Sequence, residues 1–122
     1  MQGSRRVFDG DRLRAELWLP ATATGTLYVT FRQRLPDPGT FSDDPPVRRA
    51  LGQGLAHLHI QSRWNDWFLN DETVALEKAL AGLRGGFLGA RALGYSMGGY
   101  GALRLARSLG LDQAILVSPQ FT

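Results

Sequence analysis

With 122 residues, 43% of them hydrophobic and 20% charged, the chain is long enough for one domain with a modest core, and no apolar run could span a bilayer. The absence of cysteine excludes disulfides and thiolate metal sites and, with no signal-peptide pattern at the N-terminus, leads us to expect a cytoplasmic protein. The net charge is +3, but the arginines are scattered rather than gathered with aromatic residues, so no nucleic-acid partner is expected.

Two short strands are expected at the N-terminus, joined by a tight turn. Val7-Phe8 and the segment Leu13 to Leu19 flank Asp9-Gly10-Asp11, a sequence that favours a hairpin. In the second of these strands, apolar and polar residues alternate, so one face should be buried and the other partly wet. A third strand, Thr26 to Phe31, follows, because this segment is rich in β-branched and aromatic residues.

The third strand leads into a long connection. Residues 32–46 form a polar loop with four prolines, and its length suggests a functional role. Pro45-Pro46 then favours a short helix over Val47 to Gly52. Leu55 to Ile60 is expected to form a fourth strand.

The second half of the chain alternates helices with strands. A helix is expected to begin at Asn70, a good N-cap, and to end at Gly85-Gly86. Phe87 to Tyr95 is rich in leucine, alanine and glycine, which suits a strand buried on both faces. Met97 to Leu109 has helical periodicity and precedes a glycine suited to the C-terminal cap. Gln113 to Ser118 is predicted to be a further buried strand.

One motif lies between the strand ending at Tyr95 and the next helix. Residues 94–98 read Gly-x-Ser-x-Gly, with Ser96 at the centre and Gly94 and Gly98 on either side. A chance match is common for so short a pattern, but few chance matches fall between a buried strand and an amphipathic helix. This position favours a nucleophile elbow, in which glycines let the two backbones pass closely and the serine is held above the sheet edge.

Residues 94–102 resemble the elbow of the α/β-hydrolase family, in particular its esterase and lipase-like members. The resemblance implies that Ser96 is a nucleophile and that the Met97 backbone N–H is one oxyanion donor. It places the second donor after the third strand, at Phe31 or Arg32. Many members have a His-Gly pair there, which this chain lacks, so an ordinary surface loop is the alternative.

The order of the predicted elements extends this resemblance over nearly the whole chain. We expect residues 1–122 to form one three-layer α/β/α domain, with a mostly parallel sheet that begins with an antiparallel hairpin. The alternation of strands and helices alone favours this class, and the family resemblance implies the strand order 1-2-4-3-5-6. The domain would correspond to the N-terminal half of the family fold, a truncated form of it.

The residues that should activate the serine are not found after it. The family order is serine, acid, histidine, yet residues 97–122 contain one acid, Asp112, and no histidine. Asp112 precedes its strand and therefore lies at the wrong end of a parallel sheet. His57 and His59 share one face of the fourth strand, about 10 Å from the elbow strand in the implied order. One interpretation is that both histidines are packed or hydrogen-bonded core residues. The alternative is that one of them is the base for Ser96, and His59 is then the better of two poor candidates.

Aromatic and polar residues near the same sheet edge are candidates for substrate binding. Trp64, Asp66 and Trp67 follow the fourth strand, and Tyr95 precedes the serine, so they could line an acyl or sugar pocket. The alternative is that Trp67 and its neighbours only cover the next helix. No cofactor is expected, since Gly52-Gln53-Gly54 lacks the third glycine of a dinucleotide fingerprint. No metal site is expected either, because the two histidines lack a suitably spaced carboxylate.

Two functions remain open. The first is an esterase-like serine hydrolase for a small ester or acyl substrate, incomplete in this chain and expected to show little turnover alone. The second is a non-catalytic binding or structural module that pairs with another chain. Gln113 to Ser118 would then be an open sheet edge, through which a homodimer could form.

Overall fold

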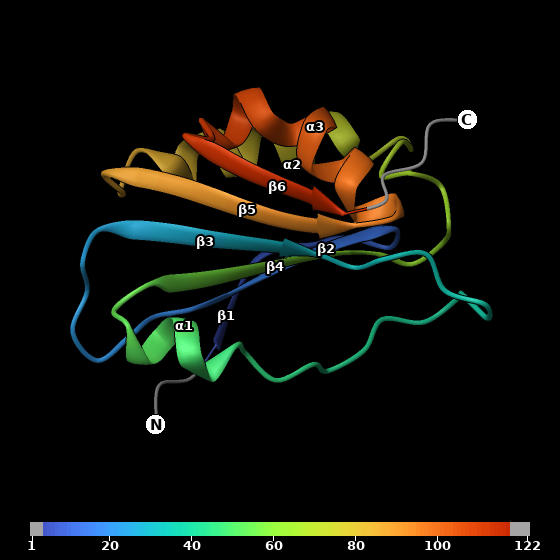
Figure 1. The fold of residues 1–122 in the computed structure, drawn as a ribbon. Helices are drawn as coiled ribbons and strands as arrows, with labels where there is room; N and C mark the ends of the chain where they lie inside the picture. Colours follow the sequence, from blue (N-terminus) through green and yellow to red (C-terminus); the bar gives the residue numbers. More distant parts are fainter. Residues whose placement is uncertain (1–3, 118–122) are drawn as a thin grey trace.

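The computed structural model describes residues 4–117, in which six strands and three helices alternate along the chain (Figure 1). The strands are β1 (Ser4–Asp9), β2 (Leu13–Trp18), β3 (Thr26–Phe31), β4 (Ala56–Ser62), β5 (Gly89–Tyr95) and β6 (Gln113–Val117). The helices are α1 (Arg48–Gly52), α2 (Thr73–Arg84) and α3 (Met97–Leu109). None of these helices is long and apolar enough to cross a lipid bilayer. Ser118, the last residue of the predicted sixth strand, lies outside the described residues.

All six strands form one sheet in the order β1-β2-β4-β3-β5-β6, as predicted. β1 pairs with β2 and β2 with β4 in antiparallel fashion, whereas β3 is parallel to both β4 and β5, and β5 to β6. The carboxyl ends of β3, β4, β5 and β6 therefore share one edge of the sheet. In open parallel sheets this edge is where ligands bind.

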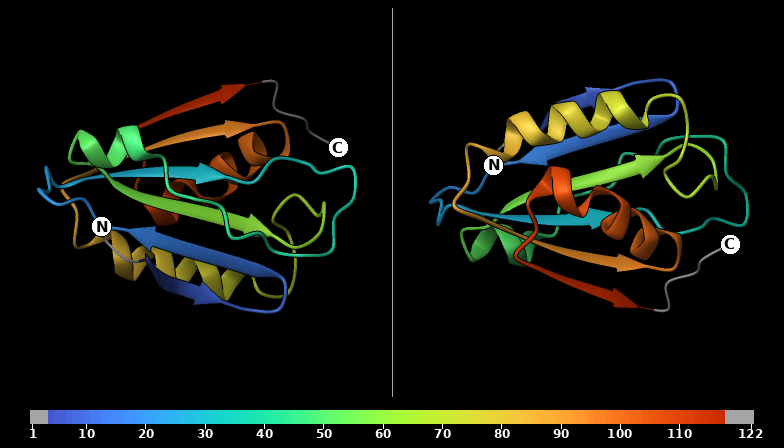
Figure 2. Two further views of the ribbon diagram at one scale, coloured as in Figure 1. Left: turned by 90° about the horizontal axis from the view of Figure 1, so that it is seen from below. Right: turned by 90° about the horizontal axis from the view of Figure 1, so that it is seen from above.

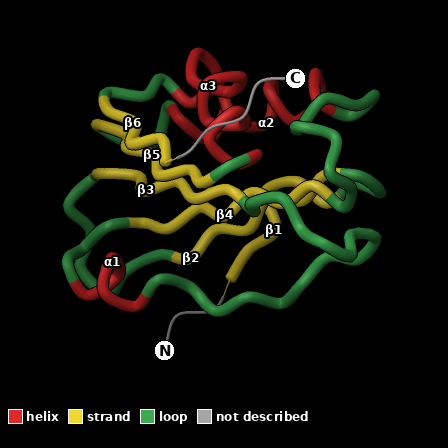
Figure 3. The backbone as a smooth tube through the Cα atoms, turned by 45° about the vertical axis from the view of Figure 1, so that its right-hand side comes forward, coloured by secondary structure: helices red, strands yellow, loops and turns green. Residues whose placement is uncertain are grey.

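The helices divide unequally between the two sheet faces. α2 and α3 cover one face, and the much shorter α1 lies on the other (Figures 1 and 3). The main core lies between the sheet and the α2/α3 layer, where alternate strand residues such as Leu27, Val29, Leu58 and Ile60 are fully buried. Burial of each such side chain contributes about 1.5–3 kcal/mol, so this layer supplies most of the hydrophobic stabilisation.

Two strands are less buried than their sequences suggest. β5 buries only its helix-facing residues, and Arg91 on the other face is exposed. In β6, Ile115 is 56% and Val117 38% exposed. The expectation of strands buried on both faces was therefore wrong for the described part of the chain. β5 and β6 are exposed on the sheet face opposite α2 and α3 because no described helix covers them there, as the view from below shows (Figure 2, left).

The start of α2 differs from the sequence-based expectation. The helix begins at Thr73 rather than next to Asn70. The Asn70 side-chain oxygen accepts a hydrogen bond from the Glu72 N–H (2.9 Å), which stabilises a separate turn before the helix. The Asn70 N–H donates to the Thr73 hydroxyl, which in turn donates to the Phe68 carbonyl. Asn70 therefore acts as a cap, but of this turn and not of α2.

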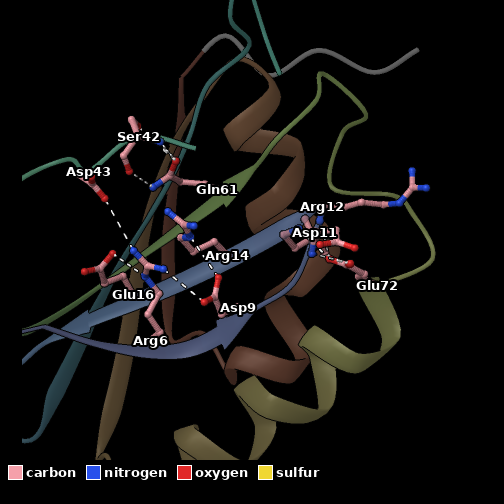
Figure 4. A network of polar contacts seen from close by, with 11 residues as sticks. Arg6, Asp9, Asp11, Arg12, Arg14, Glu16, Ser42, Asp43, Gln61 and Glu72 are labelled. Atoms are coloured by element: carbon pink, nitrogen blue, oxygen red, sulfur yellow. Dashed lines mark hydrogen bonds and ion pairs between the residues drawn. The ribbon is translucent and has the colours of Figure 1, made fainter. Parts of the chain in front are cut away.

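Glu72 connects α2 to the N-terminal hairpin, which lies about sixty residues earlier in the sequence (Figure 4). Its carboxylate accepts hydrogen bonds from three successive backbone N–H groups, those of Asp11, Arg12 and Leu13, each 2.9 Å long. These hydrogen bonds outweigh partial desolvation, so the pKa of Glu72 is lowered. A Cβ atom at Gly10 would clash with this carboxylate, so the glycine in the turn permits the close approach.

We expect Glu72→Gln to lower the free energy of unfolding by about 1–2 kcal/mol, because a neutral amide cannot replace a carboxylate that accepts three N–H groups. Urea denaturation at neutral pH measures this change. Glu77→Gln on the same helix is the control, since within residues 4–117 the Glu77 side chain makes only a 3.9 Å ion pair with Arg104, and the substitution should change stability by less than about 0.5 kcal/mol. Equal effects of the two substitutions would contradict the role of the hairpin contact.

Candidate active site

Ser96 occupies the sharp turn between β5 and α3. Its backbone angles are φ 54° and ψ −122°, a strained conformation for a residue with a side chain. The strand before it ends at Tyr95 and the helix after it begins at Met97, so the turn consists of this single residue. Both features agree with the predicted strain and with the predicted position at the carboxyl end of the sheet.

The two motif glycines permit this turn. A Cβ at Gly94 would lie 2.6 Å from the Gly98 carbonyl carbon and 2.7 Å from the Gly99 nitrogen. A Cβ at Gly98 would lie 3.0 Å from the Phe31 carbonyl oxygen, at the end of β3. The strand, the helix and the neighbouring strand therefore meet without room for a side chain, as the spacing of the motif predicted.

The atoms around Ser96 include N–H groups with no acceptor within the helix. Met97 is the first residue of α3, so its N–H is among the first four, which lack intrahelical partners. The Ser96 N–H donates to the Val117 carbonyl (2.9 Å), which fastens the turn to β6. Among residues 4–117, the Ser96 hydroxyl has no hydrogen-bond partner, and it is half-buried at the sheet edge.

The hydrogen bonds at the end of β3 bear on which N–H group could be the second oxyanion donor. The Arg32 N–H donates to the Ile60 carbonyl (2.9 Å), so it is occupied by β4 and not available to an oxyanion. Because N–H directions alternate along a strand, the Phe31 N–H points to the opposite side, toward β5. Phe31 is still inside the β3 strand, whereas Gln33 lies beyond its end. Gln33, which the sequence interpretation did not consider and which lines the cavity at this edge, is therefore a further candidate for the second donor.

The Arg32 side chain anchors the loop of residues 32–46. It is 8% exposed, and its guanidinium donates to the Thr40 carbonyl (2.7 Å), the Ser62 carbonyl (3.1 Å) and the Ser42 hydroxyl (3.0 Å). Burial lowers the pKa of Arg32 from its usual value, and the nearby Asp44 opposes this change. The arginine thus stabilises the path of the loop.

Two side-chain amides hold the same loop by pairing with its backbone. Asn65 accepts from the Leu35 N–H (2.9 Å) and donates to the Leu35 carbonyl (2.7 Å). Gln61 on β4 makes the same pair of hydrogen bonds with Ser42, at 2.9 and 2.8 Å. The loop consequently runs back across the sheet face over β4 (Figure 2, left), with Gln61 and Ser42 visible in Figure 4.

A cavity of about 580 Å³ lies between this loop and the carboxyl ends of the strands. Its lining residues come from β3, β4, β5 and the loop: Phe31, Arg32, Gln33, Leu35, Ser42, Asp44, His59 and Tyr95. Tyr95 was predicted as a substrate-binding residue. Of the loop residues, Arg32 was named in advance, as a possible oxyanion donor. Gln33, Leu35, Ser42 and Asp44 were missed, because only the length of the loop indicated a function and no periodicity showed which side chains face inward.

The other predicted binding residues do not line this cavity. The Asp66 carboxylate accepts hydrogen bonds from the Phe68 N–H and the Asn70 amide, and it contacts the Ser62 hydroxyl, so it organises the turn after β4. Trp67 packs edge-on against Tyr100 of α3. Trp64 is half exposed. Their part in substrate binding stays a prediction.

Both histidines belong to a hydrogen-bonded row on the sheet face opposite α2 and α3. The Val47 N–H donates to His57 Nδ1 (3.1 Å), and Thr30 Oγ1 lies 2.7 Å from both His57 Nε2 and His59 Nδ1. His59 Nε2 lies 3.5 Å from the Asp44 carboxylate. Burial, together with the neighbouring His59, lowers the pKa of His57 to about 4, and burial also lowers that of His59.

We expect this row to make stability depend on pH. His57 is neutral in the folded protein down to about pH 4, whereas the unfolded chain binds a proton near pH 6.5. Its contribution is therefore complete above pH 6.5 and is lost as the pH falls from 6.5 toward 4, with a loss of about 2 kcal/mol at pH 5. Urea denaturation at pH 7 and pH 5 measures it.

The variant His57→Asn should remove the part of this difference that is due to His57, leaving the loss due to His59. Because the variant could be less stable at every pH, the comparison is of the pH-dependent difference and not of absolute stability. An NMR titration of the wild-type His57 ring gives a second test. A ring that titrates near pH 6.5 would contradict the depressed pKa.

His59 is not placed to act as a base for Ser96. It pairs with Thr30, which pairs with Leu93 across the sheet, so these three residues lie in one row. Ser96 is three residues beyond Leu93, about 10 Å along the strand and a further 10 Å across two strand spacings. Asp112 is also distant, since its carboxylate accepts a hydrogen bond from the Ala90 N–H at the amino end of β5. Residues 4–117 contain no cluster of acidic and histidine side chains that could hold a metal ion.

Comparisons with solved structures agree with the fold described above. No family model and no curated protein matches the sequence. Among solved structures, a capsule O-acetyltransferase of Neisseria meningitidis serogroup A is 18% identical, with a TM-score of 0.61 over 93% of this chain and 50% of its own. An α/β serine hydrolase without lid from Xanthomonas campestris is also 18% identical, with a TM-score of 0.60 over 97% of this chain and 61% of its own. An esterase from Aspergillus oryzae is 18% identical, with a TM-score of 0.58 over 89% of this chain and 25% of its own.

These likenesses cover most of the present chain but only part of each neighbour. The chain spans about half the length of the capsule O-acetyltransferase and a quarter of the Aspergillus esterase. The six-stranded, mostly parallel sheet with its helices thus matches part of a larger α/β fold. The chain has the fold of the α/β serine hydrolases and esterases over this part of their structure.

Proposed function

We propose that the chain carries the nucleophile and the oxyanion site of a serine hydrolase for ester or acyl substrates. The observation that carries the proposal is the backbone of Ser96, held at positive φ at the carboxyl end of the sheet. Strain of this kind persists only where surrounding contacts enforce it, and it is concentrated at functional sites. The lack of cysteine and of a membrane-spanning helix in the described residues supports a cytoplasmic location.

In this proposal the Ser96 hydroxyl attacks the carbonyl carbon of the substrate. The negative charge on the carbonyl oxygen is stabilised by the Met97 N–H and by a second N–H at the end of β3, for which Phe31 and Gln33 are the candidates. Tyr95 borders the site, and Gly94 and Gly98 maintain the turn. The base and acid must come from outside residues 4–117, so we expect little turnover by the chain alone. In serine proteases, loss of the triad lowers kcat by about 10⁶-fold.

Rescue by added imidazole tests the proposal, because imidazole can supply the missing base. Hydrolysis of p-nitrophenyl acetate is measured with increasing imidazole, and the rate of the Ser96→Ala variant is subtracted to remove the reaction in solution. We expect an imidazole-dependent rate that requires Ser96, and acetylation of Ser96 by peptide mass spectrometry in preference to Ser108. Identical rates for the wild type and Ser96→Ala at every imidazole concentration would contradict the proposal.

A second candidate function is a non-catalytic module that pairs with another chain through β6. The observation in its favour is that β6 is the last strand of the sheet in the described residues and exposes Ile115 and Val117. Edge-to-edge pairing of two copies would give a twofold dimer. Sedimentation equilibrium should show a dimer at tens of micromolar that Ile115→Lys weakens. A monodisperse wild-type monomer would rule out this homodimer.

A further inference from the structure

Residues 43–49, which we call the strap, run along the sheet face opposite α2 and α3 and include the start of α1 (Figure 1). Both ends of the strap are fixed. Ser42, just before it, makes two hydrogen bonds with the Gln61 amide, and Ala50, just after it, is buried. Between these ends every residue except the half-buried Pro46 is exposed. The strap is therefore a segment with two anchored ends and a loosely covered middle.

Within residues 4–117, one hydrogen bond joins the backbone of the strap to the sheet. The Val47 N–H donates to His57 Nδ1 on β4, at 3.1 Å. Pro45 and Pro46 have no N–H group, so the two residues before Val47 supply no other backbone donor. The middle of the strap thus depends on an acceptor atom of a titratable side chain.

The other polar contacts between the strap and the sheet are two long ion pairs. Asp43 lies 3.8 Å from Arg6, and Asp44 lies 3.5 Å from His59. The Asp43 side chain is 92% exposed and that of Asp44 47%, so neither pair can replace the hydrogen bond from Val47.

The hydrogen-bonded row around His57 determines which ring nitrogen carries the proton. The Val47 N–H can only donate, so Nδ1 of His57 must accept and its Nε2 must carry the proton. This Nε2 lies 2.7 Å from the Thr30 hydroxyl, to which it donates. A second proton would have to bind Nδ1, where it would face the Val47 N–H. Two donors cannot share a hydrogen bond, so the doubly protonated ring is incompatible with the closed strap.

The surroundings of His57 also favour a neutral ring while the strap is closed. The ring stacks on Trp18 of β2, with centroids 5.3 Å apart, and lies 5.7 Å from the ring of Tyr28 on β3. Burial lowers the pKa of His57, and a charge on His59 lowers it further. Charged groups near this row come from every neighbouring element: Asp44 and Arg49 of the strap, Arg32 after β3 and Glu16 of β2.

We propose that His57 is a proton-operated latch, which holds the strap on the sheet while its ring is neutral and releases residues 43–49 when the ring binds a second proton. Release changes the walls of two cavities. Asp44 borders the cavity of about 580 Å³ at the carboxyl edge of the sheet, and Val47 and Arg49 border another of about 260 Å³. The latch requires no reaction at Ser96, so it and the proposed hydrolase chemistry can succeed or fail separately.

Hydrogen exchange of the Val47 amide, followed by NMR at pH 7, 6 and 5, tests the latch. The protection factor is compared, because it removes the intrinsic pH dependence of exchange. Opening of the strap gives His57 its ordinary pKa of 6.5, so protons favour the open form as the pH falls. We expect the protection of Val47 to fall about 20-fold between pH 7 and pH 5. At each pH it should be lower than that of the Arg32 N–H, which bonds to Ile60 in the sheet.

Two glutamine variants separate the latch from general acid sensitivity. In His57→Gln, the side-chain oxygen can accept from Val47 but does not titrate, so the change in protection between pH 7 and pH 5 should be less than about twofold. His59→Gln is the matched control, since His59 lies on the same face of β4 but does not contact the Val47 N–H. This variant should keep most of the fall.

A measurement on the wild type covers the case in which His57→Gln does not fold. Long-range ¹H–¹⁵N NMR at pH 7 should show the His57 proton on Nε2, and a proton on Nδ1 overturns the proposal. The proposal is also overturned if the protection of Val47 falls less than about fivefold between pH 7 and pH 5, or if His57→Gln keeps the wild-type fall. Equal protection of Val47 and Arg32 overturns it too, because the strap would then open only when the whole domain unfolds.

Discussion

Gly94→Ala is expected to lower the free energy of unfolding by about 3 kcal/mol or more. The added methyl group would overlap the backbone of the first turn of α3, at Gly98 and Gly99. Backbone atoms cannot move aside as a flexible side chain does, so the strand and helix would have to separate. The separation would also disturb the Ser96 N–H bond to Val117. Urea or thermal denaturation measures the change.

Gly82→Ala is the control for this experiment. Gly82 lies inside α2, and a Cβ there would meet no heavy atom within 4 Å. Alanine is the better helix former, so this substitution should stabilise the protein by up to about 1 kcal/mol. The two glycine-to-alanine changes are therefore expected to have opposite signs. A Gly94→Ala variant as stable as the wild type would show that the turn is looser than its geometry implies.

Phe68→Ala is expected to have the second large effect, a loss of about 3–5 kcal/mol. Phe68 is fully buried and packs edge-on against Phe31, with ring centroids 5.7 Å apart. Its ring also lies against α3, where a Cβ at Gly101 would come within 2.7 Å of it. Removing the ring leaves a cavity where the turn after β4, the end of β3 and α3 meet.

The matched control is Trp64→Ala in the same connection. Trp64 is of similar size but 48% exposed, so its removal should cost less than about 1 kcal/mol. Phe68→Leu should recover part of the loss, because it refills some of the volume. If Trp64→Ala and Phe68→Ala destabilised the protein equally, Phe68 would not have the central packing role assigned to it.

Features that depend on local sequence could be predicted. Thr26 to Phe31 was predicted with its observed bounds, because β-branched and aromatic residues end there at a polar loop. Gly110 has positive φ and caps α3, as its position after the apolar pattern indicated. The turn at Ser96 was predictable as well, since Gly94 and Gly98 are required by backbone contacts that the motif encodes.

Features that depend on what covers a residue could not be predicted. Ile115 and Leu93 belong to apolar strands, but their exposure is set by the layer above them and not by their own sequence. Asn70 has the preferences of a helix cap, and those preferences are equally satisfied by the turn before α2. In each case several structures are compatible with the same local pattern.

The cavity was beyond sequence reasoning for a related reason. The loop has no periodicity, and the groups that fix its path are far along the chain, at Gln61 and Asn65. The Asn65 side-chain amide pairs with the backbone of Leu35, thirty residues earlier, and the local sequence does not indicate such a contact. The position of Asp44 opposite His59 follows only once that path is known.

The fastening of this loop has a consequence for amide hydrogen exchange. The N–H groups of Leu35, Gly39 and Ser42 each donate to an acceptor in or just after β4, at 2.9 Å. These protons should exchange only when the loop detaches from the sheet, so they should exchange at one common rate. A segment without regular secondary structure would then behave as a single cooperative unit, more like a seventh strand than a surface loop.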